Sequence, residues 1–215
     1  MQTSMIQDIY ILGVGHYTPE IIELAEHCGY HVAGLYHYTP GCTGEIRYGI
    51  RIVGSYEDLF KEKSLAGRYY ALSMGNNNIR ADLFTRIISR GGVCPSLLHP
   101  TSIISRFATI ETGCQLHAYS KVQAHAHIGE NCIICEYSLI CHDTQIGSHT
   151  FIAAKTTAGA YTHIGEHVFM GLSSVSIPSK AKTIGKGAVI GAGAVVCRDV
   201  AADSVVVGNP AHPLL

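Results

Sequence analysis

The sequence predicts a mixed fold: a small N-terminal α/β (Rossmann-like) domain over residues 1–95, then a left-handed parallel β-helix of hexapeptide repeats over residues 96–215. Three observations predict it. Strand and helix patterns alternate before residue 90, apolar residues recur at every sixth position after residue 97, and glycine often follows these apolar residues. Alternating strands and helices form a parallel sheet, and a fixed short period is typical of a repeat architecture.

The first half reads as alternating strands and helices. Residues 8–12 (DIYIL) precede a glycine-rich turn, and an amphipathic run then opens at Thr18-Pro19. Thr18 is predicted as the N-cap of this helix, and Gly29 suits its end. Further strands are predicted over 31–36 and 69–74, and further helices over 55–63 and 79–89.

The turn after the first strand is a candidate ligand site. It consists of Gly13, Val14, Gly15 and His16. Glycines at this place expose backbone N–H groups beside a helix N-terminus, which can cradle a phosphate or a nucleotide. A tight turn that simply needs two glycines is the alternative interpretation.

The period of six dominates the second half. Thirteen apolar residues in one phase follow without a break: Leu98, Ile104, Ile110, Leu116, Val122, Ile128, Ile134, Ile140, Ile146, Ile152, Ala158, Ile164 and Met170. We expect each to fill the interior of a triangular coil of three hexads, with the following glycine relieving the corner backbone. Residues eighteen apart then stack on the outer wall about 4.8 Å from each other. Between Met170 and Ile184 two extra residues are expected to bulge out, around residues 173–182.

Composition limits the function classes. The chain has 215 residues, is 47% apolar and 14% charged, and carries a formal net charge of −1. We therefore expect a soluble globular protein in the cytoplasm, with no nucleic-acid or membrane partner. The eight cysteines, including the pair Cys132 and Cys135, are interpreted as small buried hydrophobes rather than as disulfides or metal ligands.

The segment Cys141-His142-Asp143 is the candidate catalytic site. His142 follows an interior position and should face outward, where a ligand can reach it. One coil away, the small side chains of Ala124 and Ala160 leave room for a thioester, and the amides near Gly159 and Ala160 could polarise its carbonyl oxygen. Asp143 could orient the imidazole as a general base. An exposed or interface histidine without a catalytic role is the alternative.

Five segments together resemble one family. They are the glycine-rich turn, residues 74–80 (MGNNNIR), 97–105 (LLHPTSIIS), 141–147 (CHDTQIG) and 206–211 (VVGNPA). The sequence is similar to the NeuD-like sugar acetyltransferases, which include sialic acid O-acetyltransferases and N-acetyltransferases of nucleotide-linked 4-amino sugars. The resemblance covers nearly the whole chain.

The resemblance implies how such a protein works. It implies a homotrimer, acetyl-coenzyme A bound along the β-helix between subunits, and transfer of acetyl to a sugar or nucleotide sugar in surface glycan synthesis. His142 and Asp143 match the family's base and the acidic residue after it. The N-terminal domain is expected to hold the sugar nucleotide, with Asn76 of the 74–80 segment among the contacts.

Three positions depart from the family pattern. The first turn has only two glycines, and Tyr36, His37 and Tyr38 stand where acidic residues often contact the nucleotide. We expect Tyr36 and His37 to line the substrate site. Phe151 stands where the family often has a histidine near coenzyme A, and it is expected to contact the cofactor together with Gly159 and Ala160.

One alternative nucleophile and two alternative functions compete with this hypothesis. Cys141 adjoins the base and is a rival nucleophile, although a buried thiol without a cationic neighbour should be inert. His127 and His163 lie two coils apart on one wall, as in zinc-binding β-helix trimers of the carbonic-anhydrase-like type, but Gln145 lies between them. A trimeric scaffold without catalytic activity is the third alternative. We expect no metal.

Overall fold

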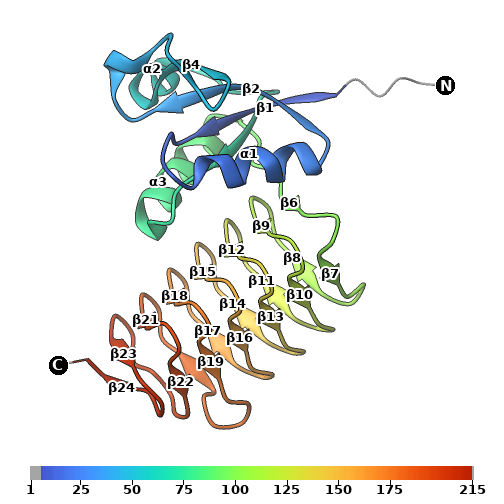
Figure 1. The fold of residues 1–215 in the computed structure, drawn as a ribbon, viewed down its shortest axis with the longest axis vertical. Coiled ribbons are helices and arrows are strands. Elements are labelled where there is room, and N and C mark those ends of the chain that lie inside the picture. Colours follow the sequence, from blue (N-terminus) through green and yellow to red (C-terminus); the bar gives the residue numbers. More distant parts are fainter. Residues whose placement is uncertain (1–5, 215) are drawn as a thin grey trace. The chain divides into compact units, whose positions relative to one another are not determined.

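The computed structural model describes residues 6–214 and divides the chain into two compact units after Leu97 (Figure 1). The sequence had placed this division two residues earlier. None of the helices within the described residues combines the length and the apolar character that a membrane crossing requires.

The first unit is a five-stranded sheet with helices. Its elements are β1 (Gln7–Leu12), α1 (Thr18–His27), β2 (Tyr30–His37), the 3₁₀ turn η1 (Pro40–Cys42), β3 (Ile46–Arg47), β4 (Ile50–Ser55), α2 (Tyr56–Lys61), β5 (Tyr69–Leu72) and α3 (Asn77–Ile88). The strand order is β3-β4-β2-β1-β5, and all neighbours are parallel except β3 and β4. The chain leaves β1 to one side for β2 and β4, and returns to its other side for β5. The C-terminal ends of these strands therefore meet at one edge beside β1.

The helix ends correct one prediction and confirm another. Thr18 is the first residue of α1 and not its cap, because its hydroxyl accepts the Gly15 N–H at 2.9 Å and contacts the Ser73 hydroxyl at 2.9 Å. Gly29 follows the helix with a φ of +84°, as a C-terminal glycine should. At α2, Ser55 and Asp58 form a capping box.

Two strands of this unit escaped prediction. β4 alternates buried and exposed residues at its start, and β3 pairs with it through a turn at Tyr48 and Gly49, which both have positive φ. Residues 38–50 thus contain η1 and β3, and most of their side chains are exposed.

The second unit is a parallel β-helix with three flat faces. Face 1 consists of β7 (Ile103–Ile104), β10 (Lys121–Val122), β13 (Leu139–Ile140), β16 (Thr157–Ala158), β19 (Val175–Ser176) and β22 (Val195–Val196). Face 2 consists of β8 (Thr109–Ile110), β11 (His127–Ile128), β14 (Gln145–Ile146), β17 (His163–Ile164) and β20 (Thr183–Ile184). Face 3 consists of β6 (Leu97–Leu98), β9 (Gln115–Leu116), β12 (Ile133–Ile134), β15 (Phe151–Ile152), β18 (Phe169–Met170), β21 (Val189–Ile190), β23 (Val205–Val207) and β24 (His212–Pro213). β24 is antiparallel to β23.

The period of six is confirmed as the interior of this coil. Ten of the thirteen in-phase residues, from Leu116 to Met170, are at most 1% exposed and form one apolar core. The first three, Leu98, Ile104 and Ile110, belong to the first coil and are partly exposed. Strands eighteen residues apart pair in register, as in Lys121 with Leu139, which confirms the predicted stacking.

The role predicted for the corner glycines is wrong in its detail. Glycines that directly follow the interior residue have ordinary φ, and a Cβ there would strike the backbone of the next coil: at Gly147 it would lie 2.5 Å from the Glu166 nitrogen. The left-handed residue comes two places later and is usually not glycine, as at Asp143 with a φ of 58°. The glycines therefore permit close stacking of coils.

The extra residues form a longer loop on one edge of the helix. Ser176 occupies the interior position after Met170, is fully buried, and the chain then bulges over residues 177–182 before Ile184 resumes the phase. A polar side chain at this position broke the apolar pattern in the sequence. The loop lies on the edge between faces 1 and 2.

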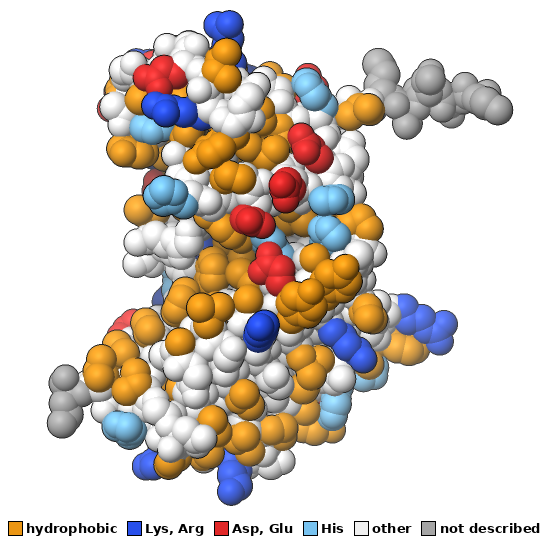
Figure 2. All heavy atoms as spheres, in the orientation of Figure 1, with side chains coloured by type: hydrophobic (Ala, Val, Ile, Leu, Met, Phe, Trp, Pro, Cys, Tyr) orange, Lys and Arg blue, Asp and Glu red, His pale blue; other side chains and the backbone are white. Residues whose placement is uncertain are grey.

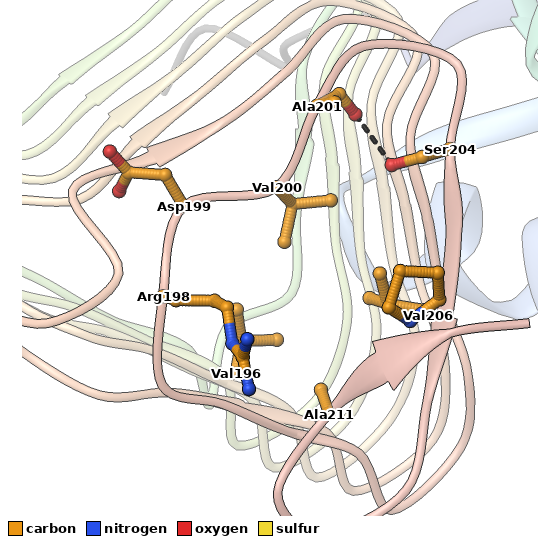
Figure 3. Close-up of a pocket in the computed structure, with 9 residues that line it drawn as sticks. Val196, Arg198, Asp199, Val200, Ala201, Ser204, Val206 and Ala211 are labelled. Carbon is orange, nitrogen blue, oxygen red and sulfur yellow. Dashed lines mark hydrogen bonds between the residues drawn. The ribbon is translucent and has the colours of Figure 1, made fainter.

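The last coil encloses a cavity of about 240 Å³ (Figure 3). Val196, Val200, Val206 and Ala211 give it apolar walls, and the Ser204 hydroxyl donates to the Ala201 carbonyl at 2.7 Å. Asp199 also borders the cavity, but its carboxylate accepts two backbone N–H groups of residues 182 and 183. The cavity thus continues the apolar interior to the end of the helix.

Candidate active site

His142 and Asp143 form a hydrogen-bonded pair on the edge between faces 1 and 2. The imidazole Nδ1 lies 2.7 Å from the Asp143 Oδ2, and the side chains are 47% and 38% exposed. If Nδ1 carries the proton, the carboxylate holds the imidazole in the tautomer whose Nε2 has a free lone pair. The described residues give this Nε2 no hydrogen-bond partner, so it is available to accept a proton from a ligand.

Two further residues fix the position of His142. The Gln123 side-chain carbonyl accepts the His142 backbone N–H at 3.0 Å. The Tyr161 ring lies edge-on against the imidazole, with centroids 5.1 Å apart and planes at 88°. Sequence reasoning missed Tyr161, although the spacing of eighteen residues places it one coil further along the helix, in register with Asp143.

The predicted role of the amides near Gly159 and Ala160 needs correction. The Gly159 N–H donates to the Ser176 hydroxyl at 2.8 Å, because the polar interior residue points toward it. The Ala160 backbone N–H donates to the Cys141 sulfur. Both amides are therefore engaged within the chain and do not point at a bound thioester. What Gly159 and Ala160 contribute is small size on the coil next to His142.

Cys141 lies beside the base but lacks the surroundings of a nucleophile. Burial raises the pKa of its thiol above the usual value, and the Ala160 N–H opposes this shift only in part. Near neutral pH the thiol is therefore protonated and poorly nucleophilic. All eight cysteines lie within the described residues and none forms a disulfide; four are buried and four half-buried.

Phe151 does not lie near His142 within one chain. It is on face 3, where its ring stacks on Phe169 at 5.3 Å between centroids. In a triangular coil, the edge between faces 1 and 2 is opposite face 3. Within one chain, His142 and Phe151 therefore face different directions.

The histidines considered as zinc ligands lie on face 2. His127, Gln145 and His163 stack in register, and His127 Nε2 is 2.9 Å from the Glu111 carboxylate. No group of three histidine, cysteine, aspartate or glutamate side chains in residues 6–214 is arranged to hold a metal ion.

The first unit has a cavity of about 260 Å³ where its strands end. Gly13, Val14, Gly15, Tyr38, Tyr56, Ser73, Met74 and Ile79 line it. The structure thus brings the predicted glycine turn into a cavity. None of the other five was predicted as a substrate contact. Tyr38, Met74 and Ile79 lie in segments that the sequence had compared with the family, whereas Tyr56 and Ser73 follow strand ends and carried no signal.

The remaining predicted substrate contacts lie outside this lining. The Tyr36 side chain is 7% exposed and belongs to the core, while its carbonyl accepts the Gly13 N–H at 3.0 Å. His37 stacks on Tyr38, and His16 is exposed. The Asn76 carbonyl oxygen caps α3 by accepting two backbone N–H groups at 3.0 Å.

Basic side chains do not gather on the face that Figure 2 shows. Figure 2 shows lysine and arginine side chains scattered mostly singly over the visible face of the described residues, without a continuous basic patch. This distribution fits the near-zero net charge of the sequence.

Comparison with known proteins finds a matching family model and several solved structures with the same architecture. A family model described as bacterial transferase hexapeptide (six repeats) matches residues 107–142 and 125–160. No curated protein matches the sequence. Among solved structures, a histidine-to-asparagine variant of perosamine N-acetyltransferase from Caulobacter crescentus, in complex with CoA and GDP-perosamine, is 25% identical; the match covers 98% of both chains with a TM-score of 0.89.

Two further structures show the same extent of similarity. The acetyltransferase domain of PglB from Neisseria gonorrhoeae is 26% identical, over 97% of this chain and 100% of that one, with a TM-score of 0.85. WeeI from Acinetobacter baumannii is 25% identical with the same coverage and a TM-score of 0.84.

The triangular coil, the hexapeptide match and the edge histidine together define an acyltransferase with a left-handed β-helix. The preceding α/β unit is part of the matched structures as well, since these cover nearly the whole chain. The similarity to these acetyltransferases over nearly the whole chain supports the resemblance to the NeuD-like sugar acetyltransferases.

Proposed function

We propose that this protein transfers the acetyl group of acetyl-coenzyme A to the amine of a nucleotide-linked 4-amino sugar. The single observation that carries the proposal is the His142–Asp143 pair, whose imidazole is anchored on one side and open on the other. The similarity to an N-acetyltransferase that binds CoA and GDP-perosamine supports this choice of substrates.

The proposed chemistry is a direct transfer. His142 Nε2 takes a proton from the sugar amine while the amine nitrogen attacks the thioester carbonyl. The carbon–nitrogen bond forms, the carbon–sulfur bond breaks, and coenzyme A leaves as a thiol once it receives a proton. Asp143 keeps the imidazole oriented and stabilises its protonated form. This route needs no covalent acyl-enzyme, which agrees with the protonated state of Cys141.

The active form is proposed to be a homotrimer in the cytoplasm. His142 and Phe151 lie on opposite sides of one coil, so a shared contact with acetyl-coenzyme A requires two copies. A neighbouring copy would also exclude water from the exposed imidazole. Light scattering at micromolar concentration is expected to give three times the chain mass, and a monomer would contradict this arrangement.

Thiol release from acetyl-coenzyme A tests the activity. The purified protein is offered GDP-, UDP- and dTDP-linked 4-amino sugars, the matching 4-hydroxy sugars, and free sialic acid. We expect release only with the amino sugars, together with an acetylated product by mass spectrometry. Thiol release with sialic acid alone would instead support the second candidate, O-acetylation. If none of the offered acceptors causes thiol release, the proposal is refuted.

A further inference from the structure

The cavity of the first unit has no charged side chain in its lining. Its walls come from the turn of Gly13, Val14 and Gly15, from Ser73 and Met74 after β5, and from Tyr38, Tyr56 and Ile79. Two amides of the glycine turn are engaged within the chain, because the Gly13 N–H donates to the Tyr36 carbonyl and the Gly15 N–H donates to the Thr18 hydroxyl. The turn therefore offers few backbone donors to a phosphate. The walls suit instead a flat and mostly apolar group.

Tyr38 presents a supported aromatic ring to this cavity. It directly follows β2 and is 72% exposed, so most of its ring is not covered by the chain. One side rests on His37, with ring centroids 4.3 Å apart and planes at 26°. His37 is itself held by the Thr39 N–H, which donates to its Nδ1 at 2.8 Å. The stacked rings of Tyr38 and His37 thus form a platform, and the hydrogen bond from Thr39 to His37 helps to fix its orientation.

The cavity wall that the glycine turn forms is held by hydrogen bonds. The Gly15 N–H donates to the Thr18 hydroxyl, and this hydroxyl contacts Ser73 at 2.9 Å, so the glycine turn is tied to the end of β5. A Cβ on Gly13 would lie 2.6 Å from the Ser73 carbonyl oxygen, which shows how closely the two segments approach. A ligand therefore meets a preformed slot and not a flexible loop.

We propose that Tyr38 is the stacking surface for the base of the nucleotide that carries the sugar. The inference rests on the proposed function, because it names how that substrate is held. A planar base fits between the platform and the glycine turn, and its π-face needs no charged partner. Recognition through a ring tolerates any base, so guanine and uracil are both candidates for this position.

Calorimetric titration of the full-length protein tests this inference without catalysis. The probes are GDP, UDP and inorganic pyrophosphate, each at one fixed salt concentration. The variants are Tyr38→Ala, Tyr38→Phe and, as a matched control, Ile46→Ala. Ile46 is also an exposed apolar residue of the first unit, 65% exposed, and it does not line the cavity.

The expected result separates the base from the phosphates. Tyr38→Ala should weaken binding of at least one nucleoside diphosphate by about 5- to 100-fold, the range for losing one base stack, and leave pyrophosphate binding unchanged. Tyr38→Phe and Ile46→Ala should bind like the unchanged protein, because the ring remains in both. The nucleotide whose affinity falls most identifies the base.

Three results would overturn the inference: no loss in Tyr38→Ala, an equal loss in Tyr38→Phe, or an equal loss of pyrophosphate binding. The proposed function fails separately. If nucleotide binding depends on Tyr38 but no amino sugar is acetylated, the base site stands without the reaction. If amino sugars are acetylated and the Tyr38→Ala protein keeps its KM for them, the reaction stands without this base site.

Discussion

The imidazole Nδ1 of His142 lies 2.7 Å from the carboxylate of Asp143, its neighbour in the sequence. Side chains of consecutive residues usually diverge, but Asp143 has a φ of 58° as the left-handed residue of its corner. Aspartate tolerates this conformation better than most residues. The corner geometry that repeats along the helix is therefore compatible with this pair.

Replacing His142 by Ala or Asn should lower kcat by about 10²–10⁴, the range for losing a positioned general base. Coenzyme A binding and the melting temperature should change little, because the side chain is 47% exposed and leaves no core cavity. Steady-state rates at saturating acetyl-coenzyme A, with thermal melts of the same samples, measure this. Near-full activity of either variant would exclude His142 as the base.

Asp143→Asn should reduce kcat less than about 100-fold, since the imidazole remains and only its orientation and basicity suffer. Asp203 offers a matched control, because it also has a left-handed backbone, with a φ of 57°, and lies exposed on another corner. Asp203→Asn should leave kcat unchanged. Equal losses in the two variants would mean that the effect comes from the corner backbone and not from contact with His142.

The interior of the β-helix could be predicted because a fixed spacing along the sequence determines which residues point inward. The same apolar phase persists from Leu116 to Met170, so the main core positions and the stacking follow from counting. The smaller buried residues two places earlier, such as Cys132 and Thr144, vary in polarity and gave no such pattern. The corner conformation could not be predicted in this way. Which residue takes positive φ depends on hydrogen bonds between coils, and the glycines proved to mark close backbone approach instead.

The candidate site was predictable only where the repeat fixes it. The outward position of His142 and Asp143 follows from their place after an interior residue. The interior position of Ser176 could not be predicted, because its side chain is polar and the pattern counts apolar residues. Tyr38 and Tyr56 lie just beyond strand ends, where local hydrogen bonds set the path of the chain and no periodicity applies. Thr18 was misplaced for the same reason, since its hydroxyl prefers Gly15 and Ser73.

Cys141 should be dispensable for turnover and slow to alkylate. Because burial raises the pKa of its thiol above the usual value of 9.0, the reactive thiolate is scarce at pH 7 and increases only as the pH rises past that value. Iodoacetamide labelling followed by peptide mapping should show this rise, and Cys141→Ala should keep at least about half of kcat. A larger loss in Cys141→Ala than in His142→Ala would point to cysteine as the nucleophile.

Gly159→Ala should disturb the edge that carries His142. A Cβ at this position would lie 2.3 Å from the Ser176 carbonyl oxygen and 2.9 Å from the Pro178 Cδ, so backbone must move. We expect a loss of about 1–3 kcal/mol in the free energy of unfolding, as for overpacking in a filled interior. The hydrogen bond from the Gly159 N–H to the Ser176 hydroxyl should weaken as well, and kcat should fall because this coil stacks on that of His142.

Two variants make this last prediction specific. Gly41→Ala is the control, because a Cβ there meets nothing within 4 Å, and its effect should stay within about 0.5 kcal/mol. Ser176→Ala removes the hydroxyl and leaves the buried Gly159 N–H without its acceptor, which should also cost about 1–3 kcal/mol. Urea unfolding followed by circular dichroism compares the three proteins. If Gly159→Ala proves as stable as Gly41→Ala, there is room for a Cβ at this edge. The close approach of residues 176–178 to Gly159 would then be contradicted.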